Sequence, residues 1–296
     1  MPTFYNFRQD GLDYSFDDIF VPADLFREGN LWTWGFGNYG RLGNAVVTDT
    51  STPVTTFAGG TNWKQISGGT FLTTAIKTDG TLWVWGSAGN GRLGNAVTTG
   101  NISTPVTTFA GGNNWKEVSS GNQHTSAIKT DGTLWIWGAG SSGRLGNAVT
   151  TGNISTPVTT FAGGTNWKQV SSGSGSHTAA IKTDGTLWTW GLGSSGQIGD
   201  NTSLINRLTP VTTFAGGTNW KQVTGGLSHT SAIKTDGTLW IWGAGGNGRL
   251  GNAVTIGNIS TPVTTFAGGT NWKQVSGGSA HTAAVFSGTT PDLPIS

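Results

Sequence analysis

Histidine offers the most versatile chemistry in this chain, because imidazole serves as a general base and as a metal ligand near neutral pH. The four histidines occupy one slot of a repeated segment, in front of a threonine: His124, His177, His229 and His281. Leu72 fills that slot in the first copy, which favours a packing role. Ser176 and Ser228 precede two of them, but neighbours along a strand point to opposite faces. We therefore expect no catalytic serine–histidine pair and no metal site.

A glycine pattern typical of dinucleotide sites, Gly-x-Gly-x-x-Gly, follows a predicted strand at residues 138–143. Such a site needs a helix directly afterwards and an acidic residue about 20 residues further on. The next residues, Arg-Leu-Gly-Asn-Ala-Val-Thr, have no helical period, and the next acid is Asp184. The sequence therefore predicts no cofactor, and we expect the chain not to be an enzyme.

Arginines recur in the segment Gly-x-x-Gly-Arg-Leu-Gly, at Arg41, Arg92, Arg144 and Arg249, with Gln197 in the fourth copy. Guanidinium groups at equivalent positions around a ring would bind an anion or an acidic partner on one ring face. Solvated loop charges are the alternative. One charge per repeat is not the dense basic stripe of a nucleic-acid binder, so we do not expect nucleic acid as a partner.

A repeat that covers most of the chain must position these residues. Leu-Trp-x-Trp-Gly begins at five places, Leu31, Leu82, Leu134, Leu187 and Leu239, and all 15 tryptophans belong to the repeat. In one unit, residues 127–137 form a hairpin around Asp131-Gly132, and residues 157–161 and 167–171 are two further strands. A period near 50 residues with about four strands per unit predicts an all-β propeller. We expect the paired tryptophans to pack between blades. Platforms for a sugar or a nucleobase are the alternative for some of them.

The two ends of the repeat array are complementary. The last unit stops at 281–286 without its own Leu-Trp-x-Trp-Gly strand, and the first begins at 31–35 without the strand that should precede it. Pairing of these two segments would complete a fifth blade and remove open sheet edges. We therefore predict a five-bladed propeller over 31–286, closed by its terminal strands, with 287–296 as a tail. An open spiral closed by a second subunit is the alternative.

Residues 1–30 form a non-repeat N-terminal arm. They carry six acidic and two basic residues, a net charge of −4, whereas the remainder carries +6, which gives the total of +2. We expect this arm to dock on another subunit or partner through acidic and aromatic side chains: Phe4, Tyr5, Phe7, Tyr14, Phe16, Asp17, Asp18, Phe20 and Phe26. The alternative is that the arm packs on its own propeller as a plug or lid.

The pattern His-Thr-x-Ala-Ile-Lys-Thr-Asp-Gly-Thr-Leu-Trp-x-Trp-Gly, followed by Gly-x-x-Gly-Arg-Leu-Gly, resembles the regulator of chromosome condensation (RCC1) repeat. The resemblance covers about 255 of the 296 residues and implies an RCC1-like propeller, although five units are fewer than is usual in that family. The family includes nucleotide-exchange factors, ubiquitin ligases and secreted enzyme inhibitors, so the fold alone does not select a function.

The arm sequence Leu-Asp-Tyr-Ser-Phe-Asp-Asp-Ile-Phe-Val-Pro, which leads into Leu-Trp-Thr-Trp-Gly, resembles the start of structural proteins of marine tailed bacteriophages. This resemblance implies a non-enzymatic virion component of the tail, fibre or capsid surface. Its arm would bind other virion proteins or identical subunits, and its propeller would contact a host-surface protein or glycan. The alternative is a free-standing propeller that binds a protein or glycan.

The expected location follows from the same resemblance, which implies the virion. Without it, we expect the cytoplasm, because the N-terminus lacks a basic stretch followed by an apolar run and so gives no secretory signal. No window of 18 apolar residues is present, so we expect no membrane insertion.

Overall fold

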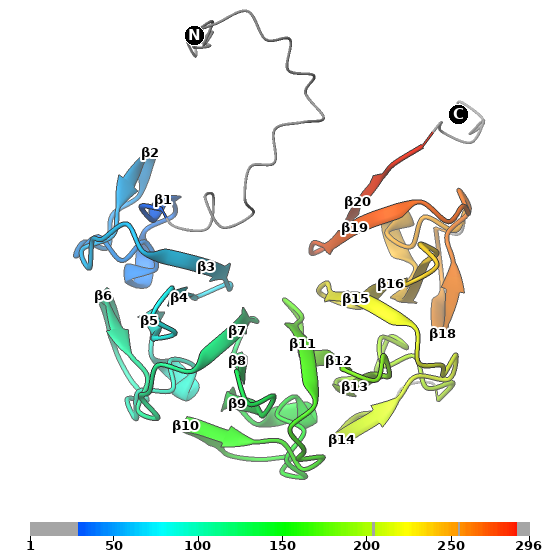
Figure 1. Ribbon diagram of the computed structural model, residues 1–296, viewed down its shortest axis with the longest axis horizontal. Helices are drawn as coiled ribbons and strands as arrows, with labels where there is room; N and C mark the ends of the chain where they lie inside the picture. The colour runs from blue at the N-terminus through cyan, green and yellow to red at the C-terminus, as the bar shows by residue number, and fades with distance from the viewer. Residues whose placement is uncertain (1–28, 203–204, 254, 289–296) are drawn as a thin grey trace, which may run out of the picture.

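Within the part of the chain that the structure describes, the strands group into four four-stranded sheets and two two-stranded sheets. The computed structural model describes residues 29–202, 205–253 and 255–288. We call each four-stranded sheet a blade. In Figure 1 the blades follow one another around an arc, with β3, β7, β11 and β15 on the inside and β6, β10, β14 and β18 on the outside. The predicted all-β fold with four strands per repeat is confirmed for these blades.

The first blade contains β3 (Trp63–Gly68), β4 (Leu72–Lys77), β5 (Leu82–Ser87) and β6 (Asn101–Thr107), and the second β7 (Trp115–Ser120), β8 (His124–Lys129), β9 (Leu134–Ala139) and β10 (Asn153–Thr159). The third contains β11 (Trp167–Ser172), β12 (His177–Lys182), β13 (Leu187–Gly191) and β14 (Arg207–Thr212), and the fourth β15 (Trp220–Gly225), β16 (His229–Lys234), β17 (Leu239–Ala244) and β18 (Asn258–Thr264). The half-blades are β1 (Trp32–Gly35) with β2 (Thr50–Thr55), and β19 (Trp272–Gly277) with β20 (Thr282–Phe286). Short 3-10 helices are η1 (Asn38–Gly40), η2 (Gly89–Gly91), η3 (Ser141–Gly143) and η4 (Gly246–Gly248).

The central hairpin of each blade forms because its turn residues suit the geometry. Asp79 accepts hydrogen bonds at Oδ1 from the backbone N–H and the hydroxyl of Thr81, at 2.9 and 2.7 Å. Gly80 has a φ of +80°, a value that glycine adopts without strain. The resulting register places Thr73 opposite Trp85 and Ala75 opposite Trp83. The same Asp-Gly turn recurs in the next three blades at Asp131, Asp184 and Asp236.

The core of the molecule lies between neighbouring blades. The second tryptophan of each Leu-Trp-x-Trp-Gly strand is fully buried in four repeats, at Trp85, Trp137, Trp190 and Trp242. Each indole N–H donates to a backbone carbonyl of the preceding repeat, at 2.8–2.9 Å. The expectation that tryptophans pack between blades is confirmed at these four positions.

The predicted ring closure is not seen in the structure. Among the described residues β1 pairs with β2 alone and β20 with β19 alone, so the segments 31–35 and 281–286 remain apart. Figure 1 shows the two half-blades on opposite sides of a gap. The physical reason is that similar contacts join neighbouring blades, so each junction sets a similar angle between its two blades. The sum of these angles decides whether the two ends meet. Repeat length alone does not determine these angles.

Candidate functional site

Neighbouring blades are joined by side-chain bonds between their innermost strands. Gln65 donates from Nε2 to the carbonyl of Val118 at 3.3 Å and accepts from the Val118 N–H at 3.1 Å. Ser67 accepts from the Ser120 N–H at 2.9 Å. The glutamine contact recurs between Gln169 and Val223 and between Gln222 and Val275. A strand that packs beside a terminal blade in the same way must therefore offer a backbone N–H and a carbonyl to the glutamine amide, and a backbone N–H to the serine hydroxyl.

A tryptophan socket is the second part of each junction. Trp137 donates its indole N–H to the carbonyl of Arg92 at 2.9 Å. A Cβ at Gly94 would lie 2.6 Å from the Trp137 Nε1, so only glycine fits beneath the ring. Apolar residues around Trp137 complete the socket: Leu82, Val84, Leu93, Trp115 and Ala127.

The same socket is empty at the C-terminal end of the arc. A cavity of about 350 Å³ is lined by the residues in the corresponding slots, Leu239, Ile241, Leu250, Gly251, Trp272 and Ala284. A Cβ at Gly251 would meet no heavy atom within 4 Å, whereas at Gly94 it would strike an indole. The cavity therefore has the walls of a tryptophan site without the tryptophan.

The N-terminal end of the arc carries the complementary group. Trp34, the counterpart of the buried Trp137, is 61% exposed, and Trp32 is 49% exposed. Ile66 on the innermost strand β3 is 48% exposed, whereas its counterpart Val118 is 2% exposed. Sequence reasoning singled out the terminal strands but missed Ile66 and Gly251, although a slot-by-slot comparison of the repeats contains both signals.

Three of the histidines form hydrogen bonds between neighbouring blades. His124, His177 and His229 have no exposed surface, and their Nε2 atoms lie 2.9–3.0 Å from the hydroxyls of Thr178, Thr230 and Thr282 in the next repeat. Burial lowers the pKa of His124 well below its usual value and the pKa of His177 and His229 to about 4, so these imidazoles are neutral near pH 7. The predicted packing role is confirmed for these three. His281, at the open end, is exposed.

The arginines of the repeated loop differ in accessibility. Arg92 and Arg144 are buried, and each donates from Nε to a carbonyl three residues earlier, that of Gly89 or Ser141. Arg41 and Arg249 are half-buried. The predicted ring-face contacts through these four arginines stay a prediction. Because Arg92 and Arg144 are buried, Arg41 and Arg249 are the two of these four arginines that solvent reaches more readily.

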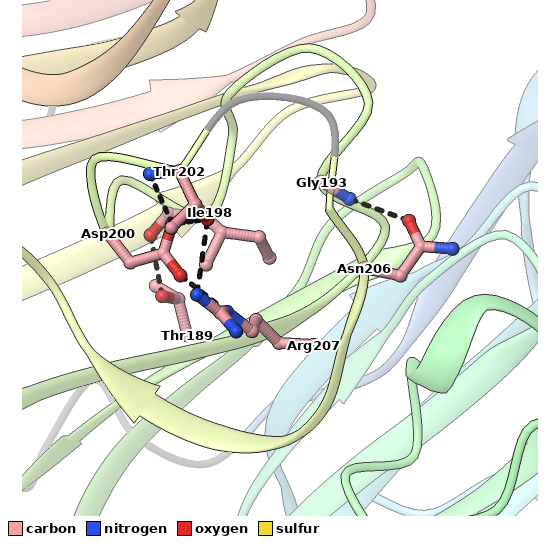
Figure 2. Close-up of polar contacts among 7 residues, drawn as sticks. All are labelled: Thr189, Gly193, Ile198, Asp200, Thr202, Asn206 and Arg207. Carbon is pink, nitrogen blue, oxygen red and sulfur yellow. Dashed lines mark hydrogen bonds and ion pairs between the residues drawn. The ribbon is translucent and has the colours of Figure 1, made fainter.

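The fourth repeat has a different loop, shown in Figure 2. Gln197 replaces the arginine and is buried, and Asp200 forms an ion pair with Arg207. Burial opposes ionisation of Asp200, but hydrogen bonds from Thr202 and Arg207 outweigh it and lower its pKa. Thr189 donates to the carbonyl of Ile198 at 2.6 Å. These contacts anchor the loop to its own blade.

The remaining predicted site residues belong to the arm. All nine lie in residues 1–28, outside the described residues, and their docking role stays a prediction. Within the described ranges no group of three or more His, Cys, Asp or Glu side chains is arranged to hold a metal ion. In the same ranges no helix is long and apolar enough to cross a membrane.

Comparison with known proteins places this architecture among known propellers. The model of the RCC1-like domain matches residues 23–290. The ultraviolet-B receptor UVR8 of Arabidopsis thaliana is 32% identical over 86% of this chain and 58% of its own length. Human E3 ubiquitin-protein ligase HERC2 is 29% identical over 77% of this chain but only 5% of its own length. The chain thus spans less than two thirds of either relative.

Solved structures agree on the fold. Human WBSCR16 superposes with a TM-score of 0.75 at 21% identity, over 88% of this chain and 68% of that one. Prp20p of Saccharomyces cerevisiae gives a TM-score of 0.74 at 18% identity, over 86% of this chain and 64% of that one. At these identities the similarity extends to the fold alone.

Proposed function

Because this chain belongs to the RCC1-like domain family, we propose that it is a non-enzymatic protein-interaction module. Its binding site is the open blade end formed by β20 and the empty tryptophan cavity. The ligand is an extended strand of the type Leu-Trp-x-Trp-Gly, which adds to the free edge of β20 by main-chain hydrogen bonds and inserts a tryptophan. The observation that carries the proposal is the match between this cavity and the filled sockets of the other repeats.

The register of the complete blades specifies how such a strand binds. Thr73 lies opposite Trp85, so the corresponding Thr282 is expected opposite Trp34. The Trp34 indole N–H would donate to the carbonyl of Arg249, as Trp242 donates to Gln197. Thr282 already donates to the Arg249 carbonyl at 2.9 Å, as Thr230 does to that of Gln197.

The strand 31–35 of the same chain is the occupant that we propose for the free molecule. Its pairing with β20 completes a fifth blade and closes the ring, which buries Trp34 and removes two open sheet edges. A second copy can supply the same strand, and in that arrangement a head-to-tail interface forms rings or filaments. A partner protein would compete for the same edge.

Relatives favour protein partners over a virion role. Prp20p has binding properties toward Gsp1p and histones, and UVR8 and HERC2 are named as a receptor and a ligase. These relatives give no support to the tailed-phage virion component predicted from the arm, or to a virion location. A free-standing interaction propeller is therefore the function that we prefer.

A cysteine pair tests the proposed closure. The chain has no cysteine, so Thr33→Cys with Ala283→Cys introduces the only two thiols, at positions expected to face each other. We expect a disulfide within the monomer under mild oxidation. The control pair, Thr33→Cys with Ala284→Cys, places the second thiol on the opposite face of β20 and should stay reduced. Reduced thiols in both pairs contradict closure, and a covalent dimer assigns the site to a second copy.

A peptide tests binding at the same edge. Trp34→Ala should release the closing strand, and a labelled peptide with the sequence of residues 29–36 should then bind the full chain. Adding Ala284→Leu, which narrows the cavity, should abolish that binding. No change in peptide anisotropy with the Trp34→Ala chain contradicts the proposed site.

A further inference from the structure

The innermost strands carry a lysine in one repeated position that no other feature of the molecule explains. Each first strand starts with Trp-Lys, which gives Lys64, Lys116, Lys168, Lys221 and Lys273. All five side chains are exposed. The strands that hold them, β3, β7, β11, β15 and β19, face the centre of the arc in Figure 1. The five cations therefore lie on the strands that line the inside of the arc.

A cavity shows that two of these lysines, Lys64 and Lys116, share one space. It has a volume of about 420 Å³ and is lined by Lys64, Gln65, Lys116, Glu117 and Gln169. The lining comes from three successive innermost strands, β3, β7 and β11, so the cavity lies on the side where those strands converge. An extended polar ligand that crosses several blades would fit this shape.

The positive charge of this surface is in surplus. Glu117 is the one carboxylate on the innermost strands within the described ranges, since the corresponding slots hold Gln65, Gln169, Gln222 and Gln274. The turn aspartates lie at the same end of the blades, because β7 begins beside Gly80, where the Trp115 N–H donates to the Gly80 carbonyl. Each of them is matched by a lysine two residues earlier, as Lys77 is for Asp79. Once each turn aspartate is matched with its own lysine, Glu117 is the one carboxylate left on the innermost strands of the described ranges to balance the five lysines.

We propose that these five lysines form an anion-binding site and that the acidic N-terminal segment of the same chain, residues 1–28, is its occupant. The segment holds six acidic and two basic residues, net −4, while the rest of the chain holds +6. Opposite net charges of this size attract each other and strengthen contacts over a distance of about one Debye length.

The point of attachment supports this occupant. Gly29 forms a β-bridge with Trp63, and the Trp63 N–H donates to the Gly29 carbonyl at 3.4 Å. The segment therefore joins the propeller directly beside Lys64, the first cation of the set. The acidic positions lie within the 19 residues before Gly29, which can span up to roughly 60 Å when extended, so they can extend well beyond Lys64 along the innermost strands.

Tryptic cleavage of the full chain tests the proposal, because the segment contains two trypsin sites, after Arg8 and Arg27. At low salt we expect slow cleavage after Arg8. High salt, or the triple substitution Lys64→Gln, Lys116→Gln and Lys168→Gln, should accelerate it about tenfold through loss of several exposed ion pairs. The set Asp10→Asn, Asp13→Asn, Asp17→Asn and Asp18→Asn should accelerate it to a similar extent. The combined variant should be no faster than either alone.

Matched controls separate charge from folding. Substitution of the same three lysines by arginine keeps the charge and should keep the protection. Circular dichroism and the melting temperature should be unchanged in all variants, because the substituted lysines are exposed. Equal cleavage rates in the unmodified chain and in the triple glutamine variant at low salt overturn the site. Protection that rises with protein concentration overturns the assignment to the same chain in favour of a second copy.

Discussion

The socket around Trp137 and the cavity beside Gly251 are built from the same residues but are occupied differently. In the first, an indole lies on Gly94 and donates to the Arg92 carbonyl, and the surrounding apolar groups are fully buried. In the second, the walls are in place and the space of about 350 Å³ is open. The walls form without the tryptophan, which is why we propose the edge of the array as a preformed binding site.

This difference shows that a repeat array has its uncovered apolar faces at its two ends. Each internal repeat satisfies the apolar face of its neighbour, and stability is the sum of such nearest-neighbour contacts. Among the described residues, the terminal repeats are the ones that retain an uncovered apolar face. In this chain Trp34 and Ile66 carry one such face, and Gly251 and Ala284 lie on the other.

Substitution of the two tryptophans gives the largest expected effect. Trp137→Ala should lower the free energy of unfolding by about 4 kcal/mol, because it leaves a cavity in a packed junction. Trp34→Ala should cost at least about 2 kcal/mol if the ring closes in solution as we propose. Denaturant unfolding of both variants measures the two values. A cost below about 0.5 kcal/mol for Trp34→Ala, typical of a surface site, contradicts closure.

The junction between the second and third blades gives the next largest effect. Glu117 stands where other repeats have glutamine, and it accepts from the Val170 N–H at 2.9 Å. Burial raises its pKa to about 7, from 4.5. The folded state therefore favours the protonated acid, and stability decreases as pH rises from 4.5 to about 7.

Glu117→Gln should remove this penalty. At about pH 8 we expect the variant to be more stable by up to about 3 kcal/mol, and at about pH 4 by much less. Gln65→Glu is the reciprocal control and should introduce the same loss at alkaline pH. Thermal unfolding at both pH values measures the effect. A stabilisation that does not depend on pH contradicts the raised pKa.

Much of the fold could be predicted because it depends on local chemistry. The Asp131-Gly132 turn, the four strands per repeat and the packing of Trp137 all follow from residues close together in sequence. Closure could not be predicted in the same way. It depends on the angle between blades, which is set by contacts such as Gln65–Val118 between residues 53 positions apart.

The candidate sites were harder to predict for a related reason. Arg92 was expected on a ring face because the repeat places its loop at an equivalent position around a ring, but the loop folds back and its Nε donates to the Gly89 carbonyl. Lys64 and Lys116 come together only when separate repeats are placed around one centre. The spacing of the repeats identifies equivalent positions, but it does not show which of those residues lie close together in the folded molecule.

The smallest expected effect compares a buried histidine with its counterpart at the open end. His177→Leu removes the bond to Thr230 but introduces the residue that the first repeat has at this slot, so we expect a loss of about 1 kcal/mol at neutral pH. The lowered pKa of His177 means that stability falls as pH drops from 6.5 to about 4, and the leucine variant should lose part of this acid sensitivity. His281→Leu is the matched control. It should show a similar loss only if closure brings His281 to Thr73, and no loss if the end stays open, so chemical unfolding of this pair at two pH values measures closure independently of the tryptophans.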